Sequence, residues 1–431
     1  MPRGVRAAAA RIGVFAAVTS FASGALADYE IYNANDTKLD LELTVMGAQF
    51  GQDAPWFGAQ HSFLNVSANH WSEFGTEFGG KLESQLWGGT LFAETTGIYT
   101  RSSGDDSSGI TEGLGHESAT TLEQARLGWK TDDTWTGLEK STLSVQIGRF
   151  DYSIGTGMIV NDGGSDGGNR GGWYIGMRKT FQNGALISLD SEDLDVQVFR
   201  FKNNPRRGGP QGEARGVNTD YKFGDSGVSV GASYLRVYPE GNEGDADVYD
   251  GRAAWNVIGG LTLSGEYAYE DGSNGLSGKG YYGQAEYAFD DVAWKPTFSY
   301  RYALFNDEFN PLAYGYTDYG YWFQGEIAGN YPLSNNNLKS DMVRAKVQPT
   351  DTITMNLIYY KFYLDKPSSF APGVTSDDFG DEVDLTFDWQ ATDRLYVIVV
   401  LAQLNPGNGA EQWTGGNQDW KYAMLNVSFT L

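Results

Sequence analysis

The sequence predicts an all-β chain that closes into a transmembrane, antiparallel, up-and-down β-barrel. Three observations lead to this prediction: polar and apolar residues alternate along many segments, the N-terminus has the pattern of an export signal, and glycine and aromatic residues are abundant while proline is scarce (57 Gly, 12 Trp, 26 Tyr, 23 Phe and 12 Pro in 431 residues). We expect eighteen strands; sixteen or twenty also fit, since single-chain bacterial barrels have an even number.

Residues 1–27 have the composition of a secretory signal peptide. Arg3, Arg6 and Arg11 form a basic start, residues 12–22 are mostly apolar, and Ala25-Leu26-Ala27 fits the small-residue rule for cleavage. The alternative is an amphipathic N-terminal helix that the mature protein keeps. We expect cleavage, which leaves residues 28–431 as one barrel domain.

No later segment is apolar enough to be a transmembrane helix, because the longest apolar run, residues 395–402, has eight residues. An exported chain without such a helix is either soluble or inserted as a closed barrel, since only a closed barrel satisfies all backbone hydrogen bonds in lipid. A soluble β-sandwich or β-helix would alternate as well. The carboxylates on the second face of so many segments favour the barrel.

The alternation identifies the strands one by one. Each alternating segment has about ten residues, which is the length that a tilted strand needs to cross a bilayer. The clearest segments are 39–45, 143–147, 261–270, 281–289, 298–304, 382–389 and 421–431.

The connections between these segments are of two kinds, as in barrels with short periplasmic turns and long external loops. Short ones lie at 225–227, 258–260, 290–291, 349–351 and 390–393, and long ones at 102–118, 161–171, 203–212, 238–247, 364–380 and 405–418. Aromatic residues near segment ends predict two girdles at the membrane interfaces. These are Trp129, Trp135, Tyr152, Trp173, Tyr234, Tyr238, Tyr314, Tyr316, Tyr319, Tyr321 and Trp322.

If the apolar face meets lipid, the other face lines the lumen, because a charge facing lipid costs about 2–4 kcal/mol at mid-membrane. The expected inward cations are Arg126, Arg178, Arg252, Arg301, Arg344 and Lys346. The expected inward acids are Glu266, Glu286, Glu326, Glu382, Asp384 and Asp388. These charges either neutralise one another or select solutes. Arginine binds carboxylates through two hydrogen bonds, so a row of arginines would attract an anionic solute.

Composition excludes several classes of site. The absence of cysteine excludes disulfides and thiolate metal sites, and the excess of acids (55 Asp+Glu against 31 Lys+Arg) disfavours a nucleic-acid partner. Three scattered histidines, His61, His70 and His116, do not suggest a metal centre. A hydrolase using His70 or His116 stays an alternative, although no nucleophile motif accompanies them.

Residues 162–173 form a Gly/Asp-rich stretch that we interpret as an external or infolded loop. Asp162 and Asp166 could bind Ca²⁺, but the stretch occurs once, without the repeat that is typical of Gly/Asp-rich calcium sites. It lacks the strand-to-helix context and the lysine of a phosphate-binding loop. We expect no other cofactor.

Three blocks of the sequence resemble the alginate-export family of outer-membrane porins. They are Gly148-Arg149-Phe150-Asp151 with Arg170-Gly171-Gly172-Trp173, the stretch from Phe309-Asn310-Pro311-Leu312 to residues 320–328, and residues 384–407 with the closing strand. The resemblance implies an eighteen-stranded barrel with an arginine-lined constriction that passes a polyuronate or a small anionic solute by diffusion.

We therefore expect a non-enzymatic diffusion channel in a Gram-negative outer membrane. Its expected partners are outer-membrane lipid and lipopolysaccharide, the barrel-assembly machinery, and an anionic saccharide or small solute, and we expect a monomer. Three alternatives stay open: a general porin that prefers cations, an outer-membrane hydrolase, and a structural or adhesive barrel that works through its loops.

Overall fold

The computed structural model describes residues 29–65, 67, 69–108, 117–132, 142–205, 211–239, 244–273, 277–313 and 324–431. The predicted signal peptide and His116 lie outside these residues. The strands are β1 (Tyr29–Ala34), β2 (Thr37–Asp53), β3 (His70–Gln85), β4 (Gly89–Ser103), β5 (Ser118–Thr131), β6 (Leu143–Phe150), β7 (Phe181–Asp190), β8 (Leu194–Lys202), β9 (Glu213–Lys222), β10 (Val228–Tyr238), β11 (Ala246–Ile258), β12 (Leu261–Gly272), β13 (Ser277–Ala288), β14 (Thr297–Phe305), β15 (Leu338–Thr350), β16 (Ile353–Leu364), β17 (Asp378–Thr392), β18 (Leu395–Pro406) and β19 (Trp420–Thr430). The short helices are η2 (Pro55–Gly58), α1 (Gln60–Leu64), η3 (Gly168–Arg170), η4 (Gly224–Ser226), α2 (Pro367–Phe370) and α3 (Asn408–Thr414).

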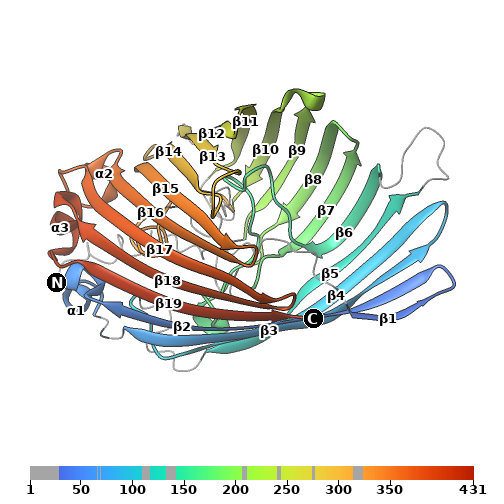
Figure 1. Cartoon of the computed structure of the whole chain (residues 1–431), viewed down its shortest axis with the longest axis horizontal. Helices are drawn as coiled ribbons and strands as arrows, with labels where there is room; N and C mark the ends of the chain where they lie inside the picture. The colour runs from blue at the N-terminus through green and yellow to red at the C-terminus, as the bar shows by residue number, and fades with distance from the viewer. Residues whose placement is uncertain are drawn as a thin grey trace.

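Strands β2 to β19 form a closed antiparallel barrel of eighteen strands (Figure 1). Each strand pairs with the next, and β19 closes the ring by pairing with β2, where Met424 lies opposite Phe50. The predicted up-and-down topology and strand number are confirmed. Strand β1 pairs with the start of β2 and continues the line of β19. Leu431, which follows β19, donates its N–H to the carbonyl of Leu43.

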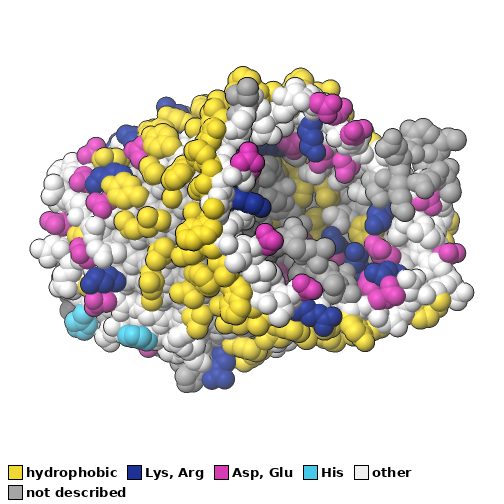
Figure 2. Space-filling model, viewed as in Figure 1, with side chains coloured by type: hydrophobic (Ala, Val, Ile, Leu, Met, Phe, Trp, Pro, Cys, Tyr) yellow, Lys and Arg dark blue, Asp and Glu magenta, His cyan; other side chains and the backbone are white. Residues whose placement is uncertain are grey.

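The two faces of the barrel wall differ as the alternation predicts. On β17, Val383 and Leu385 are 40% and 41% exposed on the outside, whereas Glu382 and Asp384 are fully buried inside. The outward apolar side chains form a broad band between charged ends, and the hollow beside that band shows charged side chains (Figure 2). This placement keeps charged side chains away from lipid, and the closed ring of strands satisfies the backbone hydrogen bonds. Among the described helices, none has the length and apolarity that a membrane span requires.

Aromatic side chains mark both edges of the outer apolar band. Tyrosines dominate near the long-loop end and tryptophans near the short-turn end, as in Tyr234, Tyr249, Tyr267, Tyr300, Tyr359, Trp87, Trp255, Trp294 and Trp389. The predicted girdle members Tyr152 and Trp173 are buried inside the barrel, so their assignment to the girdle is wrong. Trp135 and residues 314–322 lie outside the described part of the chain.

The two rims of the barrel differ in the length of their connections. Short turns such as 191–193, 259–260 and 393–394 join strands at one rim, where the connection 132–142 is the longer exception, and most long connections lie at the other rim. At the long-loop rim α1, α2 and α3 lie close together (Figure 1). Their rings form an aromatic cluster, in which Trp413 of α3 lies 4.8 Å from Phe370 of α2 and 4.9 Å from Phe63 of α1 between centroids. This cluster ties three loops together.

Candidate functional site

The connection between β6 and β7, residues 151–180, folds into the barrel and is called the first inner loop below. Its side chains Ile154, Ile159 and Ile175 are fully buried. Glycine permits the close packing, since a Cβ on Gly164 would lie 1.8 Å from the carbonyl oxygen of Arg178. The Gly-rich stretch therefore belongs to an infolded loop that is longer than residues 161–171.

A carboxylate of the wall anchors the middle of this loop. Glu73 on β3 accepts hydrogen bonds from the backbone N–H groups of Tyr174 (2.7 Å) and Ile175 (2.9 Å), and from the hydroxyl of Ser102 (3.1 Å). Such a hydrogen bond contributes about 0.5–1.5 kcal/mol net, and the loss of its acceptor costs about 1–3 kcal/mol for each buried N–H group. Because Glu73 is buried beneath the loop, it positions the loop and does not face a passing solute.

A second carboxylate anchors the end of the first inner loop. Glu123 on β5 accepts hydrogen bonds from the N–H groups of Lys179 (2.8 Å) and Thr180 (2.9 Å). Beside it, Arg178 pairs with Asp166 at 2.6 Å. The Arg178 guanidinium also donates to the Thr121 hydroxyl and the Ala119 carbonyl on β5, both at 3.0 Å. Asp166 thus holds the Arg178 side chain within the loop, and the hydrogen bonds of Arg178 to β5 fasten the loop to the wall.

The connection between β14 and β15, residues 306–337, is called the second inner loop and is described over 306–313 and 324–337. Glu382 on β17 accepts hydrogen bonds from the N–H groups of Ile327 (2.7 Å) and Ala328 (2.8 Å), and Asp384 accepts one from the Glu326 N–H (3.2 Å). The same arrangement, a buried wall carboxylate and consecutive loop N–H groups, therefore holds both loops.

The two inner loops contact each other inside the barrel. The carbonyl of Ala313 accepts hydrogen bonds from the N–H groups of Asn161 (2.6 Å) and Asp162 (3.0 Å). The rings of Tyr174 and Tyr331 lie 5.4 Å apart. The loops therefore narrow the interior together.

Ion pairs with acids hold Arg126, Arg252 and Arg178 among the six predicted lumen cations. Arg126 pairs with Glu94 at 2.5 Å, Arg252 pairs with Asp220 and Asp250, and Arg178 pairs with Asp166 as described above. For these cations the structure favours the neutralisation that the sequence left open.

The other three predicted cations, Arg301, Arg344 and Lys346, occupy inward positions on β14 and β15. Arg344 lies opposite Ser299, and Lys346 lies opposite Thr297. Ser299 and Thr297 precede Arg301 on β14 by two and four positions, so the three cations lie on the same face of the wall. Arg344 donates to the neutral side chain of Asn356 at 3.0 Å. This cluster of Arg301, Arg344 and Lys346 is called the basic patch.

The predicted acids have different surroundings. Glu266 accepts a hydrogen bond from Thr156 of the first inner loop (2.5 Å), and Glu286 accepts one from Ser299 (2.7 Å). Asp388 accepts one from the Tyr396 hydroxyl (3.1 Å). Glu382 and Asp384 bind the second inner loop.

Two placements on the barrel wall are wrong. Arg178 and Glu326 belong to the first and second inner loops and not to strands, because the alternation extends into loop residues that fold back onto the wall. Both side chains are buried. Burial next to Glu382 and Asp388 raises the pKa of Glu326 well above its usual value.

The Asp162 and Asp166 pair is used by the loop itself. Asp162 accepts the N–H of Gly164 at 2.8 Å, and Asp166 binds Arg178. Among the described residues, no three His, Cys, Asp or Glu side chains gather as a metal site would require. The Ca²⁺ site stays a prediction.

Docking of the first inner loop should depend on pH through Asp162. Burial raises the pKa of Asp162 to about 7, against the lowering effects of the Gly164 N–H and Lys179. The folded chain thus keeps a proton that an unfolded chain loses near pH 4, and docking should weaken as the pH rises from about 4 through 7. Hydrogen exchange of residues 151–180, corrected for intrinsic rates, should be faster at pH 8.5 than at pH 5.5. Asp162→Asn should reduce this difference, and an unchanged difference in that variant would contradict the assignment.

Sequence reasoning missed the anchors Glu73 and Glu123. Both occupy positions that alternate in step with the inward-facing residues of their strands, and this alternation could have identified them as inward acids. Nothing in the alternation shows that a distant loop returns to them. His70, the candidate for a hydrolase, lies on the outer surface, where its Nδ1 is 2.6 Å from the amide oxygen of Asn69.

With this geometry established, the comparisons with known proteins are informative. Residues 233–419 match the family model described as alginate export, a segment that includes β14 and β15 with the basic patch. The predicted resemblance to the alginate-export family is confirmed. No curated protein matches the sequence.

Solved structures similar to this chain are outer-membrane proteins of pseudomonads. OccK5 (OpdH) of Pseudomonas aeruginosa has a TM-score of 0.61 at 14% identity, and a BenF-like porin from Pseudomonas fluorescens Pf-5 has 0.64 at 14%; each match covers 91% of this chain and 98% of the other. OccK2 (OpdF) of Pseudomonas aeruginosa, in complex with glucuronate, has 0.57 at 12%, covering 91% and 96%. The fold is that of these porins.

Proposed function

We propose that this protein is an outer-membrane channel that passes anionic solutes of the uronate type, including alginate-like polyuronates, by diffusion. The observation that carries the proposal is the basic patch of Arg301, Arg344 and Lys346 on the inner face of β14 and β15. Guanidinium groups bind carboxylates through two hydrogen bonds. Arg301 and Arg344 are buried and Lys346 is half-buried, so a sugar acid would meet the positive charge of the patch first at Lys346.

The neighbouring acids suit transport better than tight binding. Glu286 lies beside Ser299, opposite Arg344, and Asp388 lies beside Asn356, the partner of Arg344. A channel needs binding that is favourable enough for entry and weak enough for release. Acids around the basic patch would shorten the time that a carboxylate stays there.

The comparisons support the same solute class. The basic patch lies within the segment matched by the alginate-export family, and alginate is a polyuronate. The OccK2 structure contains glucuronate, which is also a uronate. The proposed transport involves no catalytic step. We further propose that the channel is a monomer in a lipopolysaccharide-containing membrane, inserted by the barrel-assembly machinery.

Charge reversal in the basic patch should change ion selectivity. Lys346→Glu should lower the anion-to-cation permeability ratio about twofold, because a like charge then faces the entering anion. The measurement is the reversal potential in a KCl gradient across a planar bilayer, with and without glucuronate. Lys130→Glu is the matched control, since Lys130 is an inward lysine that already pairs with Glu83 at 3.2 Å. Equal shifts in both variants would contradict a specific role for the patch.

A channel that prefers cations is the second candidate, and a specific observation favours it. A polar cavity of about 430 Å³ between the first inner loop and β7–β10 is lined by carboxylates, among them Asp190, Asp195 and Asp220. Cations would collect there. A reversal potential of cation-selective sign in the unmodified protein would favour this candidate over the first.

A further inference from the structure

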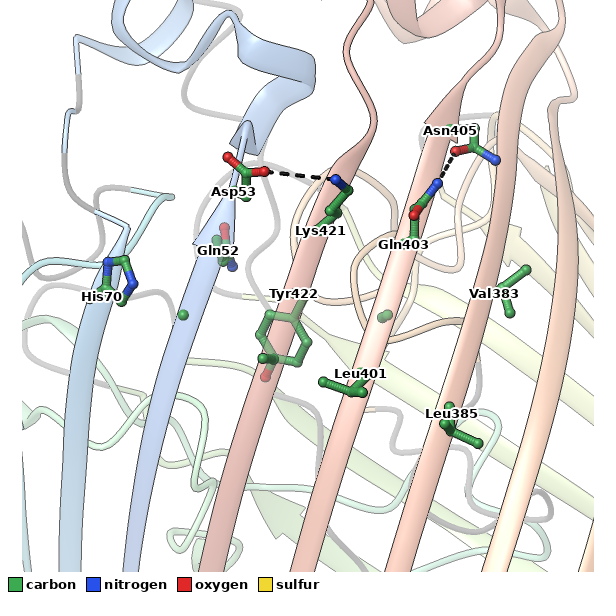
Figure 3. Close-up of a pocket in the computed structure, with 13 residues that line it drawn as sticks. Gln52, Asp53, His70, Val383, Leu385, Leu401, Gln403, Asn405, Lys421 and Tyr422 are labelled. Carbon is green, nitrogen blue, oxygen red and sulfur yellow. Dashed lines mark hydrogen bonds and ion pairs between the residues drawn. The ribbon is translucent and has the colours of Figure 1, made fainter.

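The outer surface of the barrel carries a groove of about 680 Å³ at the long-loop end of β17, β18, β19, β2 and β3 (Figure 3). It is lined by Val383, Leu385, Leu401, Ala402, Gln403, Asn405, Lys421, Tyr422, Ala423, Gly51, Gln52, Asp53 and His70. The outward-facing members of this set meet the membrane, because they share the face of the apolar band. The groove is called the lipid-facing groove below.

The lining changes from polar to apolar along the strands. Nearest the long loops lie Asp53, Lys421 and Asn405, and Leu401 lies further along β18 (Figure 3). On β19 the next outward position after Lys421 is Ala423. Outward apolar positions continue toward the short-turn rim. The groove therefore crosses the boundary between the headgroup layer and the hydrocarbon layer, where the two chemical halves of a lipid meet.

Small residues deepen the groove where the tyrosine girdle ends. On β10–β14 and β16, outward tyrosines such as Tyr249 and Tyr359 occupy the interface near the long loops. On β19 and β2 the groove instead has Ala423 and Gly51. The ring of His70 lies against Gly51, since a Cβ there would be 3.3 Å from the ring, and it forms one side of the groove. The missing aromatic side chains leave room for an acyl chain.

The polar end of the groove offers one ammonium group, that of Lys421. Lys421 is 55% exposed, and its Nζ lies 3.9 Å from Asp53, so the pair is loose and open to another anion. Among the described lining residues Asp53 is the one carboxylate. His70 adds an imidazole on β3, on the other side of β2. A phosphate can therefore compete with Asp53 for the Lys421 ammonium.

We propose that the lipid-facing groove binds one molecule of the phosphorylated, acylated glycolipid that forms the outer leaflet, the lipid A part of lipopolysaccharide. A phosphate binds Lys421 in place of Asp53, and an acyl chain lies over Ala423 between Leu401 and Gly51. The proposal depends on the outer-membrane location and not on the solute that the channel passes.

The test is native mass spectrometry of the delipidated full chain in detergent, titrated with diphosphoryl lipid A. We expect saturable binding of one molecule. Ala423→Trp, which fills the groove, and Lys421→Glu, which repels phosphate, should each weaken binding about tenfold. The matched controls are Ala345→Trp, at an outward alanine on β15, and Lys339→Glu, at an outward lysine that pairs with Asp365 at 2.9 Å. Both controls should bind like the unmodified protein.

Several outcomes would overturn the proposal. Absence of saturable binding, or equal weakening by the controls, would show that the groove is ordinary lipid-facing surface. Equal affinity for phosphatidylglycerol would refute the glycolipid as the specific occupant. A dimer that Ala423→Trp dissociates would assign the groove to a second copy of the chain. A solute selectivity that disagrees with the proposed function would leave these outcomes unaffected.

Discussion

Glu73→Ala is expected to release the first inner loop from the barrel wall. The change leaves the N–H groups of Tyr174 and Ile175 buried without their acceptor. Two such losses should cost about 2–5 kcal/mol in the free energy of loop docking. Single-channel recordings should show a larger and noisier conductance, and hydrogen exchange at residues 172–176 should accelerate. Glu73→Gln, which keeps one carbonyl acceptor, should have an intermediate effect.

Glu83→Ala is the matched control for this prediction. Glu83 lies on the same strand and the same inner face, but it pairs with Lys81 and Lys130 near the short-turn rim. Its loss should leave the conductance noise and the exchange of residues 172–176 unchanged. If the Glu73 and Glu83 variants behave alike, the anchoring role of Glu73 is wrong.

Glu382→Ala should free the second inner loop in the same way. It removes the acceptor of the Ile327 and Ala328 N–H groups, with an expected cost of about 2–5 kcal/mol in loop docking. The loop can be tested from its own side as well. A Cβ on Gly325 would lie 2.8 Å from the Glu382 carboxylate, and the φ of Gly325 is +86°, so Gly325→Ala should reproduce the effect.

Conductance and hydrogen exchange at residues 325–331 are the measurements for this second loop. Because the inner loops contact each other through Ala313, Tyr174 and Tyr331, the Glu73→Ala and Glu382→Ala effects should not be additive. Gly373→Ala serves as control, since Gly373 also has a positive φ (+89°) but has open space around it. Additive effects of Glu73→Ala and Glu382→Ala would show that the two loops act independently. Equal changes from Gly373→Ala and Gly325→Ala would show that backbone strain alone is measured.

The anchors also give the acidic composition of the chain a structural role. Glu73, Glu123 and Glu382 each accept hydrogen bonds from consecutive loop N–H groups. Buried N–H groups need acceptors, and a carboxylate can serve two or more of them at once. Some of the acidic side chains therefore hold loops inside the barrel, and only the others are available to influence passing ions.

The sequence by itself determined the barrel and the outward or inward side of most wall residues, and it bounded the strand number between sixteen and twenty. Val383, Glu382, Leu385 and Asp384 alternate because a strand turns successive side chains to opposite faces and lipid accepts only one kind. Nothing beyond local pattern is needed for this. The same rule located Arg301, Arg344 and Lys346 on the inner face.

The tertiary structure alone decided which inward charges can meet a solute. Whether Glu382 lines a pore or binds a loop depends on contacts between residues more than fifty positions apart, which no local period records. Arg178 and Glu326 were misplaced for the same reason, since an infolded loop buries its side chains against the wall without being part of it. The lipid-facing groove likewise arises because β2 and β19, from opposite ends of the chain, become neighbours only when the barrel closes.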